Sequence, residues 1–113
     1  TIKVICPYLR PEVAAQIKEG DQLLSRGQLQ PVYVKELRVE DANDTAPDST
    51  GRIVLQKHPF RKDVYLTIEG PVSNTGSELY MAGQQIRAGL SKYIVKTQLF
   101  EAEGEILEVD LQE

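Results

Sequence analysis

The chain contains one histidine and one cysteine, so a serine- or cysteine-type catalytic site would have to use His58 as its base. Cys6 is the matching candidate nucleophile. Cys6 falls in a regular strand pattern, however, whereas activated cysteines usually lie at a helix start or a sharp turn. The residue types therefore predict no catalytic residue, and we expect the protein not to be an enzyme.

A short basic segment around Pro59 and Phe60 is the second place where chemistry could occur. Such side chains bind small anions, while the formal net charge of −4 disfavours nucleic acid as a partner. An exposed hairpin tip is the alternative interpretation of the same residues. The candidate ligand-binding side chains are Lys57, His58, Arg61, Lys62 and, from a later turn, Arg87.

Acidic side chains between residues 40 and 48 raise the question of a calcium site, because hard cations prefer several oxygen ligands. Their spacing differs from that of an EF-hand loop, and Pro47 stiffens the segment. The glycine-containing segment 70–76 lacks the Gly-Lys-Ser/Thr ending of phosphate-binding loops. We therefore predict neither a metal ion nor a cofactor.

Short strands account for most of the hydrophobic pattern, since apolar and polar residues alternate between Gly and Pro positions. A helix is predicted over residues 11–18, where a proline precedes the Val13–Ile17 pair on one face. Residues 40–50 lack any large apolar side chain, so we expect an exposed mobile loop there. The predicted strands span residues 2–8, 31–39, 52–57, 63–69, 79–83, 92–99 and 105–111.

The longest of these predicted strands, at residues 31–39, contains an irregular step. Apolar residues alternate within each half of the strand, but the apolar face changes between Val34 and Leu37. We expect a bulge or a bend there, around Lys35 and Glu36.

About seven short strands and one helix predict a mainly β fold, organised as a small closed or nearly closed β-barrel. The 113 residues are expected to form one domain over residues 1–113. Because the sequence begins at threonine, we expect it to be a piece of a longer chain. Turns between strands favour residues without a Cβ. We assign this structural role to Gly20, Gly83, Gly89 and Gly104.

Two segments share a pattern of glutamine, isoleucine, a cation, any residue and glycine, at residues 16–20 and 85–89. Each follows an alternating strand, and each precedes a strand containing tyrosine and valine followed by lysine. A duplication would give a pseudo-twofold barrel, in which the isoleucine plugs the barrel end and the glycine makes the turn. Coincidence in a strand-rich chain is the alternative.

The second half of the sequence resembles a family of bacterial membrane-anchored proteins, catalogued as domain of unknown function four-three-three-zero. The first half fits more loosely, through Pro11 to Leu24 with its Ile-Lys-Glu-Gly-Asp core. The segments that carry the resemblance are DVYLTIEG (63–70), LYMAGQQIRAG (79–89), YIVKT (93–97) and FEAEGEI (100–106). The resemblance implies an N-terminal membrane helix followed by a small β-domain, and it supplies no catalytic residues.

We therefore expect a non-catalytic binding or assembly module of a bacterial envelope protein. Its partner would be a protein, and it would meet the membrane only through an N-terminal anchor absent from this chain. The expected location is extracytoplasmic, with a cytoplasmic one left open. The alternatives are a small anion-binding barrel, or a subunit of a larger ring, phage or secretion assembly. In such a homo-oligomer, edge strands such as residues 92–99 would pair between subunits.

Overall fold

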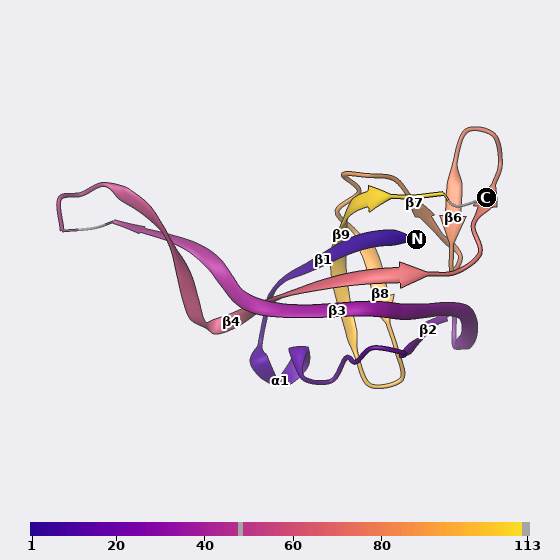
Figure 1. Cartoon of the computed structure of the whole chain (residues 1–113), viewed down its shortest axis with the longest axis horizontal. Helices are drawn as coiled ribbons and strands as arrows, with labels where there is room; N and C mark the ends of the chain where they lie inside the picture. The colour runs from indigo at the N-terminus through magenta and orange to yellow at the C-terminus, as the bar shows by residue number, and fades with distance from the viewer. Residues whose placement is uncertain (48, 112–113) are drawn as a thin grey trace.

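Strands dominate the computed structural model, which describes residues 1–47 and 49–111, with the side chains of 44–47 and 54–59 outside the description. Six strands form a sheet that curls into a nearly closed barrel, and three short strands form a second sheet beside it (Figure 1). The mainly β fold with one short helix is confirmed. The elements are β1 (Ile2–Leu9), α1 (Pro11–Ala14), β2 (Gln22–Ser25), β3 (Gln28–Pro47), β4 (Ile53–Glu69), β5 (Ser73–Asn74), β6 (Leu79–Met81), β7 (Gln84–Ile86), β8 (Tyr93–Lys96) and β9 (Glu101–Val109).

The order of strands in the main sheet is symmetric about its centre. The order is β2-β3-β4-β1-β9-β8, and neighbouring strands are antiparallel. Exchanging β1 with β4, β2 with β8 and β3 with β9 gives the same order read from the other edge of the sheet. The first strand of each sequence half therefore pairs in the middle of the sheet, next to the long strand of the other half.

The two segments that share a sequence pattern form the same turn. In the first segment, Asp21 N donates a hydrogen bond to Lys18 O at 3.2 Å. In the second segment, Leu90 N donates a hydrogen bond to Arg87 O at 3.0 Å, across the same spacing of three residues. The third residue of each turn is a glycine with a left-handed backbone, at φ +87° for the first and +92° for the second. This geometry is that of a type II turn, which requires a residue that tolerates positive φ.

Each turn also holds the long strand of its own half by two backbone hydrogen bonds. The Gly20 amide donates to the Val34 carbonyl oxygen at 2.7 Å, and the Val34 amide donates back to Asp21 O at 2.9 Å. Gly89 and the residue after it hold Ile106 in the same way, at 2.7 and 2.8 Å. The shared sequence pattern is therefore a shared structural unit, and the barrel is pseudo-twofold.

The two long strands contain the same bulge at equivalent places. The register of β3 against β4 shifts between Val34 and Glu36, so Lys35 is an extra residue. The register of β9 against β1 shifts directly after Ile106, where Leu107 is extra. The bulge predicted for β3 is confirmed. The tyrosine part of the sequence similarity does not follow the symmetry, because one tyrosine lies in β3 and the other in β8.

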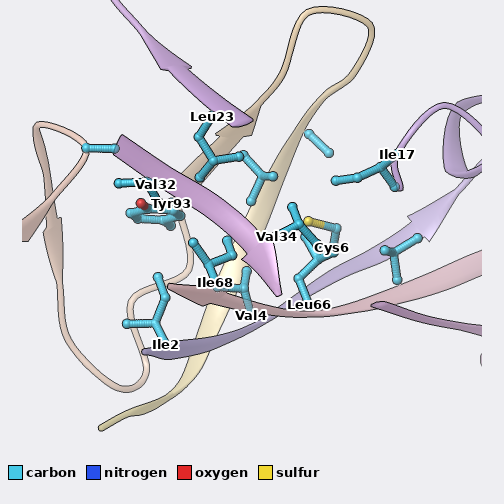
Figure 2. Close-up of a cluster of buried hydrophobic side chains, with 14 of the residues drawn as sticks. Ile2, Val4, Cys6, Ile17, Leu23, Val32, Val34, Leu66, Ile68 and Tyr93 are labelled. Carbon is cyan, nitrogen blue, oxygen red and sulfur yellow. The ribbon is translucent and has the colours of Figure 1, made fainter. Parts of the chain in front are cut away.

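The core lies inside the curled sheet and takes residues from both halves. Ile17 and Ile86, the isoleucines that precede the two turns, are each 2% exposed. Figure 2 shows Ile17 at one end of the cluster and Tyr93 at the other. The Tyr93 hydroxyl donates a hydrogen bond to the Met81 carbonyl oxygen at 3.2 Å, so the buried ring keeps its polar atom satisfied.

Gly104 lies in the middle of β9, so the turn predicted for it is wrong. A Cβ at this position would overlap Val4 Cγ1 and lie 3.2 Å from Cys6 Sγ. A Cβ at Gly70, directly after β4, would lie 2.6 Å from Val32 Cγ2. The missing Cβ thus allows Gly104 to approach β1 closely and Gly70 to approach β3 closely. The other three glycines assigned to turns have positive φ and do lie in turns, namely Gly20, Gly83 and Gly89.

The loop predicted at residues 40–50 is wrong for residues 40–47, because β3 continues through Pro47, while residues 49–50 form an exposed turn. Glu40 to Pro47 pair with β4 residues between Asp63 and Ile53. Pairing between the two strands of a ribbon is made by backbone hydrogen bonds, so the lack of large apolar side chains does not by itself prevent a strand. Residue 48 lies outside the described residues.

Other predicted boundaries change for local reasons. The helix ends at Ala14 rather than at residue 18, because the chain then turns to bury Ile17. Residues 52–57 and 63–69 belong to one strand, β4. Pro59 falls where the register moves from Lys62 to His58, a position that needs no ladder hydrogen bond from its nitrogen. β2, β5 and β7 were not predicted as strands.

The first residue and the end of β9 are joined. Thr1 N donates a hydrogen bond to Asp110 O at 2.8 Å, and Asp110 N donates to Thr1 O at 2.8 Å. Both lie at the end of the barrel away from the long β3–β4 hairpin (Figure 1).

Replacing Gly104 by alanine should lower the free energy of unfolding by about 1–3 kcal/mol, because the added methyl overlaps Val4. Denaturant unfolding measures the change. In a Val4→Ala background the same substitution should cost less, since the overlapping methyl is gone. The exposed neighbour Glu103 serves as the control, and Glu103→Ala should change stability little. An equal cost in both backgrounds would contradict the close approach.

Replacing Gly20 or Gly89 by alanine should destabilise the fold by similar amounts, roughly 1–2 kcal/mol each, because both turns need a left-handed residue. Open space surrounds both positions, so only the backbone is strained. Asparagine, which tolerates this conformation better, should cost less than alanine. A large cost at only one of the two glycines, measured by denaturant unfolding, would argue against equivalent turns.

Candidate functional site

A two-stranded extension projects from the barrel. It consists of residues 40–47 of β3 and 53–61 of β4, and is called the arm below. In the described backbone no third strand pairs with it: the pairing of β3 with β2 ends at Tyr33, and that of β4 with β1 begins at Lys62. Figure 1 shows the arm reaching away from the barrel, which gives the molecule its extents of 53 × 30 × 22 Å.

An irregular step in the β3–β4 ladder marks the base of the arm. Asp41 pairs with Lys62, whereas the next residue, Ala42, pairs with His58, so β4 has extra residues between these pairs. The strand bends sharply in this region (Figure 1). An ion pair between the Lys62 ammonium and the Asp41 carboxylate joins the two strands at the last regular pair before the bend.

Tyr8, at the end of β1, ties the base of the arm to the barrel. Its backbone has φ +59°, a left-handed conformation that is uncommon for residues other than glycine. The Tyr8 amide donates a hydrogen bond to Asp63 Oδ1 at 2.9 Å, and Asp63 is only 7% exposed. The Arg61 guanidinium lies 5.2 Å from the centre of the Tyr8 ring, within range of cation–π attraction. The arm therefore starts from a fixed position.

Two of the predicted ligand-binding side chains meet at this base. Arg61 and Lys62 are neighbours in β4, and each already has the partner described above. The side chains of Lys57 and His58 lie outside the described residues. Their backbone lies in the middle of β4, so the hairpin tip considered for this segment is not where they are. Nothing in the sequence indicates that one strand continues through Pro59.

Arg87 is not part of this group. It follows β7 and donates a hydrogen bond from Nη2 to the Ser77 carbonyl oxygen at 3.3 Å. Figure 1 shows β7 beside β6, apart from the bend in β4. Among the described side chains, Arg87 therefore lies apart from Arg61 and Lys62.

Large apolar side chains are exposed on the arm and at its base. Ile53 is 69% exposed and Phe60 74% exposed, while Tyr8 and Val39 are about half exposed. Single exposed apolar residues are ordinary on protein surfaces, but aromatic and apolar side chains beside a strand edge also suit contact with a protein. Phe60 was visible in the sequence only as a spacer between cations.

Cys6 has no access to solvent and points into the core (Figure 2). Burial raises the pKa of its thiol from 9.0 to about 12, so the nucleophilic thiolate is disfavoured at neutral pH. Cys6 pairs with Val64 inside the barrel, whereas His58 pairs with Ala42 on the arm. The register therefore places the two members of the candidate dyad in different parts of the fold.

The described residues also bear on metal sites and membrane helices. Among them, no three His, Cys, Asp or Glu side chains gather closely enough to hold a metal ion. No helix within this described part has the length and apolar character needed to cross a lipid bilayer.

A family model matches residues 1–110 of the chain. The chain belongs to this family, Domain of unknown function (DUF4330). The match confirms the family that the sequence resembles. No curated protein matches the chain, and no solved structure matches it. Membership in the DUF4330 family names no ligand or partner.

The Cys6 thiol of this DUF4330 domain should resist alkylation while the chain is folded. Burial keeps the thiol protonated, so the labelling rate of the native chain should stay low from about pH 7 to about pH 9, where an exposed thiol ionises. Mass spectrometry after iodoacetamide treatment measures the extent of labelling. The same chain unfolded in guanidinium is the control and should label fully.

The stability contribution of Cys6 has a defined sign. Folding favours the neutral thiol, so this contribution is complete below the ordinary pKa of 9.0 and is lost as the pH rises towards about 12.

In the alkylation experiment, labelling of the folded chain as fast as the unfolded control would contradict the buried position of Cys6.

Proposed function

We propose that this chain is a non-catalytic binding and assembly module, and that the arm is the part that binds a protein partner. One observation carries the proposal: the arm is a two-stranded ribbon beyond the barrel, beside which the described backbone places no third strand. An isolated two-stranded ribbon is marginally stable in water, and its edges readily pair with another strand. A partner strand added at an edge would satisfy both properties.

The base of the arm supports this proposal. The bond from Tyr8 N to Asp63 and the ion pair between Lys62 and Asp41 fix the first residues of the arm to the barrel. A ribbon fixed at its base loses less conformational entropy on binding than one on a flexible linker. The interior of the barrel supports the same conclusion, because it holds a cluster of buried hydrophobic side chains, part of which Figure 2 shows.

The setting of the module is also a proposal. We place it in the bacterial cell envelope, outside the cytoplasm, carried by a membrane anchor in a part of the protein N-terminal to this chain. The resemblance of the second half to membrane-anchored proteins is the support. The sequence of the complete gene tests this setting directly, because an apolar segment of about 20 residues before Thr1 is required.

Shortening the arm should abolish partner binding and leave the barrel folded. Replacing residues 44–56 by Asn-Gly keeps the Asn43–Lys57 pair and closes it with a two-residue turn suited to a hairpin. Circular dichroism and thermal unfolding check the fold. Affinity capture from the source cells, with intact and shortened chains as baits, identifies candidate partners, and calorimetry with the purified partner measures the Kd.

A matched pair of point variants separates the arm from the rest of the surface. Ile53 on the arm and Leu99 on the β8–β9 turn are similarly exposed, at 69% and 71%. Ile53→Thr should weaken partner binding, while Leu99→Thr should not. A partner that binds the shortened chain with unchanged Kd would refute the role of the arm.

A further inference from the structure

The main sheet has two end strands, and the barrel closes where they meet. The ladder ends at β2 on one side and at β8 on the other. Cα atoms of these two strands approach within 8 Å of each other, but in the described backbone no ladder joins them. This line between β2 and β8 is called the seam below. An end strand with unpaired backbone groups is a template for pairing with another chain, so the seam needs a cover.

The tip of the β6–β7 hairpin lies against both end strands. Its two turn residues, Ala82 and Gly83, have φ +53° and +76°, as in the tight two-residue turns that join antiparallel strands. On one side, a Cβ at Gly83 would lie 3.3 Å from Oγ of Ser25, the last residue of β2. On the other side, the Tyr93 hydroxyl of β8 donates its hydrogen bond to the Met81 carbonyl oxygen. The hairpin therefore covers the seam.

Gln84, the first residue of β7, closes the backbone edge of β8. Its side-chain Nε2 donates a hydrogen bond to Ile94 O at 2.7 Å, and its Oε1 accepts one from Ile94 N at 2.8 Å. Two residues that form a hydrogen-bonded pair in an antiparallel sheet exchange the same two bonds. The Gln84 carboxamide thus stands where a residue of a neighbouring strand would be, and it occupies both polar groups of Ile94.

The next residue of β7 shows that this bridge belongs to one side chain. Gln85 has the same chemistry and pairs with Tyr80 in the second sheet, and in the described part of the chain its carboxamide has no hydrogen-bond partner. Two core residues of β8, Tyr93 and Val95, flank the bridged residue and are fully buried. The bridge is therefore made at the one position of β7 that faces an edge of the barrel core.

We propose that the β6–β7 hairpin is a latch that closes the seam, and that the Gln84 carboxamide keeps β8 from pairing with a strand of another chain. Residues 92–99 are the segment expected to pair between subunits in a homo-oligomer, and the chain itself occupies this edge at Ile94. Opening the latch turns β8 into an acceptor for a further strand. The latch involves β7 and β8 and not the arm, so it is independent of the proposed function.

Amide hydrogen exchange, followed residue by residue by NMR, tests whether Gln84 holds the edge. In Gln84→Ala the Ile94 amide should exchange about 10- to 100-fold faster than in the unaltered chain, because two hydrogen bonds of ordinary strength close this edge. Gln85→Ala is the matched control and should leave the Ile94 rate unchanged. Equal Ile94 rates in Gln84→Ala and the unaltered chain overturn the latch.

A second variant covers the case in which Gln84→Ala does not fold, as judged by circular dichroism. Gln84→Glu keeps the length of the side chain and the acceptor for Ile94 N, but its carboxylate has no proton to donate to Ile94 O at neutral pH. Its Ile94 amide should also exchange faster than that of the unaltered chain. A carboxylate that protects Ile94 as well as the carboxamide does would contradict the two-bond bridge.

Sedimentation velocity tests whether the latch prevents pairing between chains. Gln84→Ala should self-associate at concentrations where the unaltered chain and Gln85→Ala do not, because the β8 strands of two copies can then pair about a twofold axis. Adding Ile94→Pro should remove this association, since proline has no N–H to donate and the Ile94 N–H bonds Gln84 rather than β9.

Two results overturn the proposal at this step. One is a Gln84→Ala chain whose Ile94 amide exchanges quickly but whose sedimentation equals that of the unaltered chain, because the open edge then attracts no strand. The other is an unaltered chain whose self-association disappears on Ile94→Pro alone, because β8 then pairs between chains despite the latch.

Discussion

Each glycine turn holds one residue of a long strand by two backbone hydrogen bonds, and the closure of the barrel depends on these contacts. Val34 and Ile106 are core residues, 1% and 0% exposed, so their amide and carbonyl groups need partners that exclude water. The turns at Gly20 and Gly89 supply those partners where no further strand is available. The isoleucine before each turn then reaches the core, so one short segment satisfies the backbone and fills the end of the barrel.

The halves are alike around the core and differ outside it. The connection after β1 contains α1, whereas the connection after β4 contains the small sheet of β5, β6 and β7. Beyond the shared bulge, β9 ends at Val109, while β3 continues to Pro47 and forms the arm with β4. The repeated unit contributes core residues from both halves, and the surface proposed to bind lies where the two halves differ.

The sequence predicts features that depend on local chemistry and misses those that depend on the partner strand. The turns at Gly20 and Gly89 and the bulge at Lys35 can be recognised in the sequence. A turn with positive φ favours glycine, and a bulge shifts the pattern of apolar residues to the other face. Gly104 resembles a turn glycine because only the fold shows Val4 and Cys6 against it. The β3 part of the arm has the sequence pattern of a loop, because its strands are held by pairing with each other and do not pack on an apolar core. Arg61 and Lys62 are adjacent in sequence and stay together, whereas nothing local places Arg87 beside β6.

Two hydrogen bonds hold Thr1 and Asp110 beside each other. Both residues lie in the part of the barrel away from the arm, and the arm forms the opposite end of the molecule (Figure 1). A polypeptide attached at either residue would leave the barrel on the side opposite the arm tip. The domain would then act as a spacer, holding whatever meets the arm away from the point of attachment by up to the 53 Å length of the molecule.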